Sequence, residues 1–190
     1  MPSPAAFYFD LSSPLAYLAA ERVLHVLGAP AEWRPVLAAE LPGAEAEGWG
    51  EDERERIAGR AAELGLQPLR WPEPFPFDST LAMRVATYAK SIGRTVPFAQ
   101  AAFRQAFAGG RCLAEEDSVV ISAAACEMHP KAVLQGAALR SISEQLQRAT
   151  AEAGEIGVCS VPAIAVGNRV FHGEGAPEEA AAHARGEPAR

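Results

Sequence analysis

The chain has 190 residues, a formal net charge of −7 and 49% hydrophobic residues, enough for one substantial core with an attached lobe. The acidic balance argues against nucleic acid and anionic membranes as partners, because their phosphates would repel it. No stretch approaches the roughly 20 apolar residues that span a bilayer, and residues 1–6 lack the basic region of a signal peptide. We therefore expect a soluble cytoplasmic protein.

The cysteines and histidines do not suggest a metal site or a disulfide framework. Cys112, Cys126 and Cys159 are odd in number and form no CxxC pair. The four histidines are scattered, without the spacing that places two ligands on one helix face. We expect no bound metal.

The most informative local feature is a strand that turns directly into a helix near the N-terminus. Residues 7–11 are aromatic or aliphatic except for Asp10, and apolar residues then recur at helical spacing from Leu15 until Gly28. Such a junction points several unpaired backbone N–H groups at one spot, which attracts anions. Ser13 lies at this junction, and Pro14 suits the first helical position.

The middle of the chain is predicted to be mostly helical. A second strand is expected over 31–37, with Pro35 at its end or at a sheet edge. Between residues 41 and 139 the expected helices are 51–64, from Asp78 or Ser79 to Ile92, from Pro97 to Phe107, 115–128 and 131–139. Ser141–Glu144 has the pattern of a capping box for a further helix that runs to Ile156.

The C-terminal part changes character. Apolar segments 161–166 and 169–171 flank Gly167-Asn168, a two-residue hairpin signal, and an alanine-rich helix follows Pro177. This order fits an α/β, thioredoxin-like fold with a large all-helical insertion. We expect the thioredoxin-like domain to comprise residues 1–40 and 140–190, with the helical insertion domain at 41–139.

Three segments carry a resemblance to a known family. Residues 7–19 resemble the opening of 2-hydroxychromene-2-carboxylate isomerases and kappa-class glutathione transferases, which belong to the DsbA-like thioredoxin superfamily. Residues 157–162 and 171–173 resemble the later active-site segment of the same proteins. The resemblance implies a DsbA-like fold, a cis peptide at Val161-Pro162 beside the first helix, and often a homodimer.

The resemblance also implies a chemistry. Where the superfamily's oxidoreductases carry CxxC, this chain has Ser13-Pro14-Leu15-Ala16, which holds no thiol and so cannot perform disulfide exchange itself. Ser13 is then expected to stabilise the thiolate of bound glutathione, or of another small thiol, and Val161 and Pro162 to pair with it through the backbone. A small aromatic or conjugated compound would be the substrate.

Three functions fit these expectations. They are a thiol-dependent isomerase, a kappa-like glutathione transferase, and a non-catalytic thioredoxin-like binding protein. We assign the substrate pocket to Tyr17, Phe75, Cys159 and His172. Ordinary structural roles remain alternatives: Ser13 as a plain helix cap, Cys159 as a buried apolar side chain, and the loop around Phe75 as packing.

The chain departs from the family where glutathione would be held. After His172-Gly173, relatives have an Asp-Arg pair that binds the γ-glutamyl end, whereas this chain has Glu174, which matches only with a one-residue shift. The Asn and Lys that contact glutathione in relatives are also missing. Arg34 and Arg70 are candidate cationic replacements.

Overall fold

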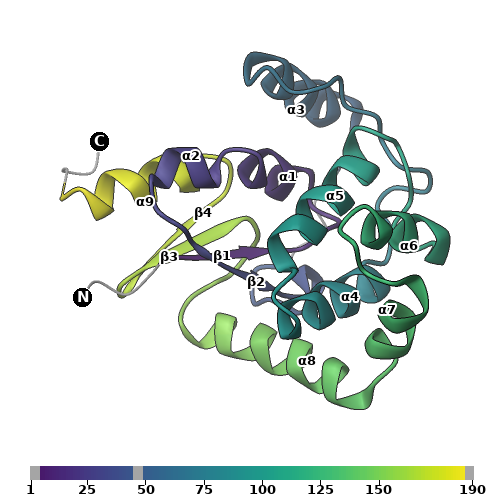
Figure 1. The fold of residues 1–190 in the computed structure, drawn as a ribbon. Coiled ribbons are helices and arrows are strands. Elements are labelled where there is room, and N and C mark those ends of the chain that lie inside the picture. Colours follow the sequence, from purple (N-terminus) through teal and green to yellow (C-terminus); the bar gives the residue numbers. More distant parts are fainter. Residues whose placement is uncertain (1–4, 45–48, 187–190) are drawn as a thin grey trace.

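The computed structural model describes residues 5–44 and 49–186, and within them it contains one four-stranded sheet (Figure 1). Its strands lie in the order β2-β1-β3-β4. Strands β1 and β2 are parallel, whereas β3 is antiparallel to both β1 and β4. The strands are β1 (Ala6–Phe9), β2 (Glu32–Pro35), β3 (Ala163–Val166) and β4 (Arg169–His172).

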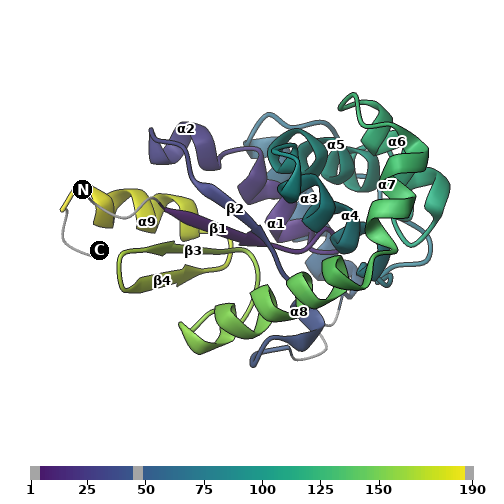
Figure 2. The ribbon, with the colours of Figure 1, turned by 60° about the horizontal axis from the view of Figure 1, so that its bottom comes forward.

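Helices cover both faces of the sheet and form a separate block beyond one end of it. In Figure 2, α2 and α9 lie on one face and α8 lies on the other, while α4 to α7 form the block. Helix α3 packs against α1 and stands apart from the block in Figure 1. The helices are α1 (Pro14–Ala20), α2 (Val23–Leu27), the 3₁₀ helix η1 (Ala38–Glu40), α3 (Glu51–Glu63), α4 (Thr80–Ser91), α5 (Thr95–Phe107), α6 (Glu116–Ala124), α7 (Pro130–Ala137), α8 (Arg140–Glu155) and α9 (Ala176–Ala184).

The alternation of side chains along β1 divides the core into two parts. Phe7 and Phe9 pack with Trp33 and Phe103 on the face that continues into the helical block. Tyr8 points to the opposite face, where a smaller cluster packs under α8. The core has two parts because successive side chains of a strand face opposite sides of a sheet.

Most expected elements are present, often with shorter ends. The hairpin at Gly167-Asn168, the helix start at Pro14 and the cis peptide at Val161-Pro162 are confirmed. The expected helices at 51–64 and 131–139 appear as α3 and α7. The helix expected from Pro97 begins two residues earlier, at Thr95, and the one expected over 115–128 ends at Ala124.

Two local predictions were wrong. The first helix does not run to Gly28 but breaks between α1 and α2 at Glu21-Arg22, where the buried Arg22 side chain binds Leu18 O and the Glu174 carbonyl. The capping box at Ser141–Glu144 does not form, because α8 already begins at Arg140 and its N-cap is Leu139. Glu144 instead pairs with Arg140.

We predict that Gly136→Ala destabilises the helical block. A Cβ atom at Gly136 on α7 would clash with the Tyr88 ring of α4, so the ring or one of the two helices must shift. Overpacking of this kind costs about 1–3 kcal/mol in the free energy of unfolding, measurable by urea denaturation. In the control, Gly59→Ala on α3, a Cβ meets nothing within 4 Å, and the helix should gain up to about 1 kcal/mol. Equal effects of the two variants would contradict the packing at Gly136.

Candidate functional site

The residues singled out by the sequence meet at one end of the sheet. Tyr8 lies opposite Ala163 and Ala163 lies opposite His172 in the strand register. The C-terminal end of β1, the N-terminal end of β3 and the C-terminal end of β4 are therefore neighbours, as Figures 1 and 2 show. This register brings the junction at Ser13 and the segment Val161-Pro162 to the same end.

Ser13 is the N-cap of α1. Its backbone is extended (φ −91°, ψ 115°), and its Oγ accepts a hydrogen bond from Ala16 N at 3.1 Å. The residue is 7% exposed. No described residue accepts a hydrogen bond from the Ser13 hydroxyl. The hydroxyl proton therefore remains available for a ligand at this largely buried position. The capping role of Ser13 is thus real and leaves its donor unused.

The α1 N-terminus offers fewer donors than the sequence suggested. Pro14 has no N–H, Ala16 N is taken by Ser13 Oγ, and Tyr17 N donates to Ser13 O. Among the first-turn amides, only Leu15 N lacks a partner among the described residues. The helix has only seven residues, so the hydroxyl and one amide are the donors that matter here.

Asp10 holds the junction in place, and sequence reasoning missed this role. Its carboxylate is 1% exposed and accepts four hydrogen bonds: from Ser12 N and Oγ at 2.9 Å, from Ala38 N at 2.9 Å and from Ser79 Oγ at 3.0 Å. Burial raises the pKa of Asp10, and these donors act in the opposite direction. The signal was available, since Asp10 is the one charged residue in the apolar run 7–11.

The Val161-Pro162 peptide is cis, and both residues are buried. Pro162 O accepts a hydrogen bond from Gly173 N at 2.9 Å, which joins this segment to the end of β4. Within residues 5–44 and 49–186, neither the N–H nor the C=O of Val161 has a hydrogen-bond partner. The Val161 backbone therefore has a donor and an acceptor free at the site.

Cys159 and His172 lie beside this segment and bind each other. His172 Nε2 accepts a hydrogen bond from Cys159 N at 3.1 Å. Cys159 O accepts from Gly43 N, and the exposed Cys159 thiol donates back to Gly157 O at 3.5 Å. The His172 ring and the Cys159 backbone thus fix the loop before Pro162.

Tyr17 and Phe75 both contact the ring of Phe107. Tyr17 is 2% exposed and stacks on Phe107 with 5.8 Å between ring centroids, and the Phe75 centroid lies 6.1 Å from that of Phe107. Phe75 is only half-buried and also packs with Trp49 and Trp71. Tyr17 is therefore core, whereas the half-buried rings around Phe75 present an aromatic surface.

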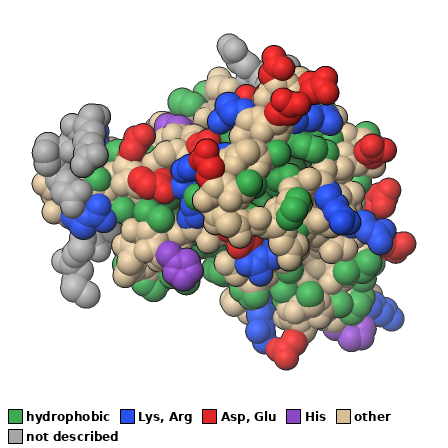
Figure 3. Space-filling view, turned by 90° about the horizontal axis from the view of Figure 1, so that it is seen from above, with side chains coloured by type: hydrophobic (Ala, Val, Ile, Leu, Met, Phe, Trp, Pro, Cys, Tyr) green, Lys and Arg blue, Asp and Glu red, His purple; other side chains and the backbone are tan. Residues whose placement is uncertain are grey.

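Glu174 follows β4, and two arginines of α3 hold its carboxylate. Arg56 Nη1 donates to one carboxylate oxygen at 3.1 Å and Arg60 Nε donates to the other. Acidic and basic side chains gather over α3 on the face shown in Figure 3. The sequence alone shows only that Arg56 and Arg60 lie one helical turn apart, which does not identify Glu174 as their partner.

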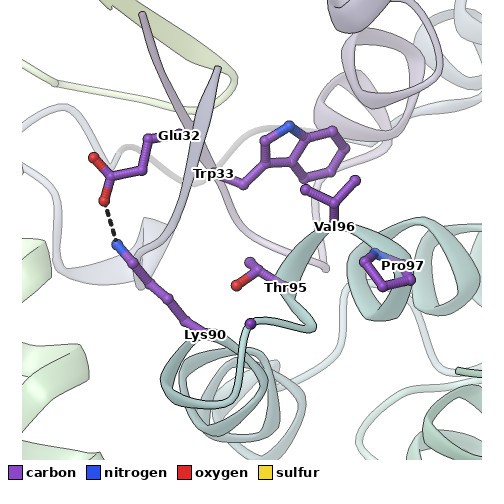
Figure 4. Close-up of a pocket in the computed structure, with 7 residues that line it drawn as sticks. Glu32, Trp33, Lys90, Thr95, Val96 and Pro97 are labelled. Atoms are coloured by element: carbon purple, nitrogen blue, oxygen red, sulfur yellow. Dashed lines mark hydrogen bonds and ion pairs between the residues drawn. The ribbon is translucent and has the colours of Figure 1, made fainter. Parts of the chain in front are cut away.

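The two arginines named from sequence lie on β2 and in the loop after α3. Arg34 binds Glu32 and Tyr8 Oη on β1 and β2, and Arg70 follows α3 in the loop whose backbone joins Phe107. A pocket of about 210 Å³ lies near Glu32, with Trp33, Lys90 and Val96 in its lining (Figure 4). Because Glu32 pairs with Ala6 at the start of β1, this pocket is at the far end of the sheet from Ser13.

Among the described residues, no three His, Cys, Asp or Glu side chains are grouped so that they could hold a metal ion. None of the described helices is long and apolar enough to cross a membrane.

The strand order, the cis-proline segment and the helical block define a thioredoxin-like protein whose helix junction carries serine in place of cysteine. The DSBA-like thioredoxin domain matches residues 6–184, and the chain belongs to this family. The expected fold class, an α/β thioredoxin-like fold with a DsbA-like helical insertion, is confirmed. No curated protein sequence matches the chain significantly.

Several solved structures share this fold. A 2-hydroxychromene-2-carboxylate isomerase is 18% identical with a TM-score of 0.78, covering 90% of this chain and 88% of that one. A probable DsbA oxidoreductase from Streptomyces coelicolor is 18% identical with a TM-score of 0.80 (98% and 92% covered). The cytosolic disulfide reductase DsbM from Pseudomonas aeruginosa, solved with GSH, is 14% identical with a TM-score of 0.66 (96% and 98% covered). At these identities the likeness shows the fold.

We predict that Asp10→Asn destabilises the protein by about 1–3 kcal/mol in the free energy of unfolding. The asparagine side chain has only one oxygen, and its NH₂ group takes the place of the other. That NH₂ group must then face a backbone N–H, either that of Ser12 or that of Ala38. Urea denaturation measures the loss. Asp78→Asn is the control, because the exposed Asp78 accepts both of its bonds from Thr80 through a single oxygen. An equal loss in the two variants would show that the Asp10 network contributes nothing specific.

The raised pKa of Asp10 also predicts a pH dependence. The unfolded carboxyl titrates near 3.8, and burial makes the folded protein keep the proton to higher pH. Between these two pKa values the folded state binds more protons, so raising the pH lowers stability through this group. The free energy of unfolding of the wild type, minus that of Asp10→Asn, should fall as pH rises above 3.8 and level off above the folded pKa. A difference that grows with pH would contradict this.

Proposed function

We propose that this protein is a thiol-dependent isomerase that binds glutathione, or another small thiol, between Ser13 and Val161. The observation that supports it most is the unused hydroxyl proton of Ser13, at the end of the sheet where Val161 also has a free donor and acceptor. The junction Ser13-Pro14-Leu15-Ala16 has no thiol of its own. A site with donors for a thiolate and no cysteine at that position suits a nucleophile brought by a ligand.

The energies available are sufficient for this role. A thiol has a pKa near 8.5, and each unit of lowering requires about 1.36 kcal/mol. A hydrogen bond to a charged group contributes about 1.5–3 kcal/mol. The Ser13 hydroxyl alone can therefore lower a bound thiol's pKa by about one to two units, which makes the thiolate common at neutral pH. Because α1 is short, its dipole adds only the lower end of about 0.3–1 kcal/mol.

The residues around the site have separate roles in the proposed reaction. A bound thiolate supplies the nucleophile, which adds to a conjugated substrate, permits rotation about the former double bond and leaves again. Ser13 Oγ–H and Leu15 N–H hold the negative charge, and the Val161 backbone pairs with a peptide-like thiol in a strand-like manner. The half-buried rings of Trp71 and Phe75 offer an aromatic surface to the substrate, with the Arg54 guanidinium lying over them at 5.0 and 5.6 Å from their centroids.

A kappa-like transferase would use the same donors, and the fate of the substrate distinguishes it. An isomerase returns the thiol and yields a product of the substrate's mass. A transferase consumes one thiol for each product formed. Mass spectrometry of the products with glutathione and conjugated aromatic acids separates the two activities.

We predict that Ser13→Ala lowers the thiolate fraction of bound glutathione, with a rise of about one to two units in its pKa. The pH dependence of thiolate absorbance near 240 nm in the complex measures this. Because Ser13 also caps α1, Ser13→Gly is the companion variant, since glycine at an N-cap costs only a few tenths of a kcal/mol.

Ser13→Thr, which keeps the hydroxyl, should retain most of the thiolate signal. An unchanged pKa in both hydroxyl-free variants would overturn the assigned role of Ser13. If neither wild type nor variants bind any small thiol, the protein is instead a non-catalytic binding protein of this fold.

A further inference from the structure

The cluster of Arg56, Arg60 and Glu174 brings together two separate parts of the chain. The two arginines lie one turn apart on α3, and each donates to a different oxygen of the Glu174 carboxylate. The other acidic partners, Glu53 and Glu63, belong to α3 itself and are 37% and 70% exposed, against 23% for Glu174. Among the described residues, Glu174 is thus the carboxylate that reaches the arginines from the loop after β4.

Glu174 lies next to the proposed thiol site. Gly173 N donates to Pro162 O, so Glu174 comes one residue after the contact with the cis-proline segment. Its own carbonyl accepts from Arg22 Nη2 at 2.7 Å, and Arg22 also binds Leu18 O on α1. The arginine pair is therefore located at the end of the sheet that carries Ser13 and Val161.

The backbone of Glu174 is held independently of its side chain. The hydrogen bonds of Gly173 N and the Glu174 carbonyl hold the main chain, and among the described residues only the two arginines hold the carboxylate. Helix α3 does not depend on this contact, since its Ile57 and Ala61 are fully buried. A rotation of the Glu174 side chain would free Arg56 Nη1 and Arg60 Nε without moving a helix, while Arg56 keeps its bonds to Glu53 and Arg60 its bond to Glu63.

Two guanidinium groups that share one carboxylate form a site for a carboxylate. We propose that Arg56 and Arg60 bind a carboxylate of the thiol ligand, and that Glu174 occupies this subsite until the ligand displaces it. The proposal rests on the proposed function, because it requires a peptide-like thiol between Ser13 and Val161. It reverses the expectation from sequence, in which Glu174 itself would contact the ligand.

The test measures whether ligand binding becomes tighter or weaker when the negative charge of Glu174 is removed. Glu174→Gln keeps the size of the side chain but weakens its hold on the arginines. Binding of S-methylglutathione by isothermal titration calorimetry at low salt should then be about three- to tenfold tighter than in the wild type, as expected for releasing charged pairs. Arg60→Gln should weaken binding by a similar factor.

Glu53→Gln and Glu63→Gln are matched controls, because each removes the same charge from a partner of the same two arginines. Each should change the affinity by less than about twofold. Weaker binding by Glu174→Gln, or the same binding as the controls, overturns the proposal, as does no binding by wild type and Glu174→Gln alike. S-methylglutathione has no ionisable thiol, so these results are independent of the thiolate measurement on Ser13.

Discussion

The buried carboxylate of Asp10 is the constraint on which the rest of the site depends. A buried charge without partners costs several kcal/mol, so this residue is tolerated only with its hydrogen bonds complete. Its partners come from the junction (Ser12), from η1 after β2 (Ala38) and from the start of α4 (Ser79). The path from β1 into α1 is therefore fixed together with the entry to the helical block, and the block and the sheet are not independent units at this point.

This constraint explains how a short helix can hold Ser13 in a defined position. Helix α1 has seven residues and would be marginal alone. Asp10 on one side and the packing of Tyr17 against α5 on the other set its direction. The donors of Ser13 and Leu15 are then oriented before any ligand arrives, and preorganised donors need no rearrangement when charge develops. The site relies on fixed hydrogen bonds more than on a helix dipole.

The parts predicted from sequence have local signals, and the missed parts depend on residues far apart in the chain. Gly167-Asn168 specifies its hairpin by itself, and the Val161-Pro162 segment was recognised by resemblance. The break of the first helix was not visible, because the partners of Arg22 lie about 150 residues later. Ser79 is the N-cap residue of α4, one of the two positions expected, but its hydroxyl binds Asp10 and not the helix backbone. The division of the chain at residues 40 and 140 stays a prediction.

The charges at the end of the sheet also set a condition on the ligand. The protein is acidic overall, so an anionic thiol must find a local group of cations. In the proposed complex, Arg56 and Arg60 would be that group, and Glu174 would compete with the ligand for them as a tethered carboxylate at high effective concentration. The thiol end of the ligand would meet Ser13, and its carboxylate would meet the arginines. Two separate contacts would then favour a ligand that carries both groups over a ligand that carries only one.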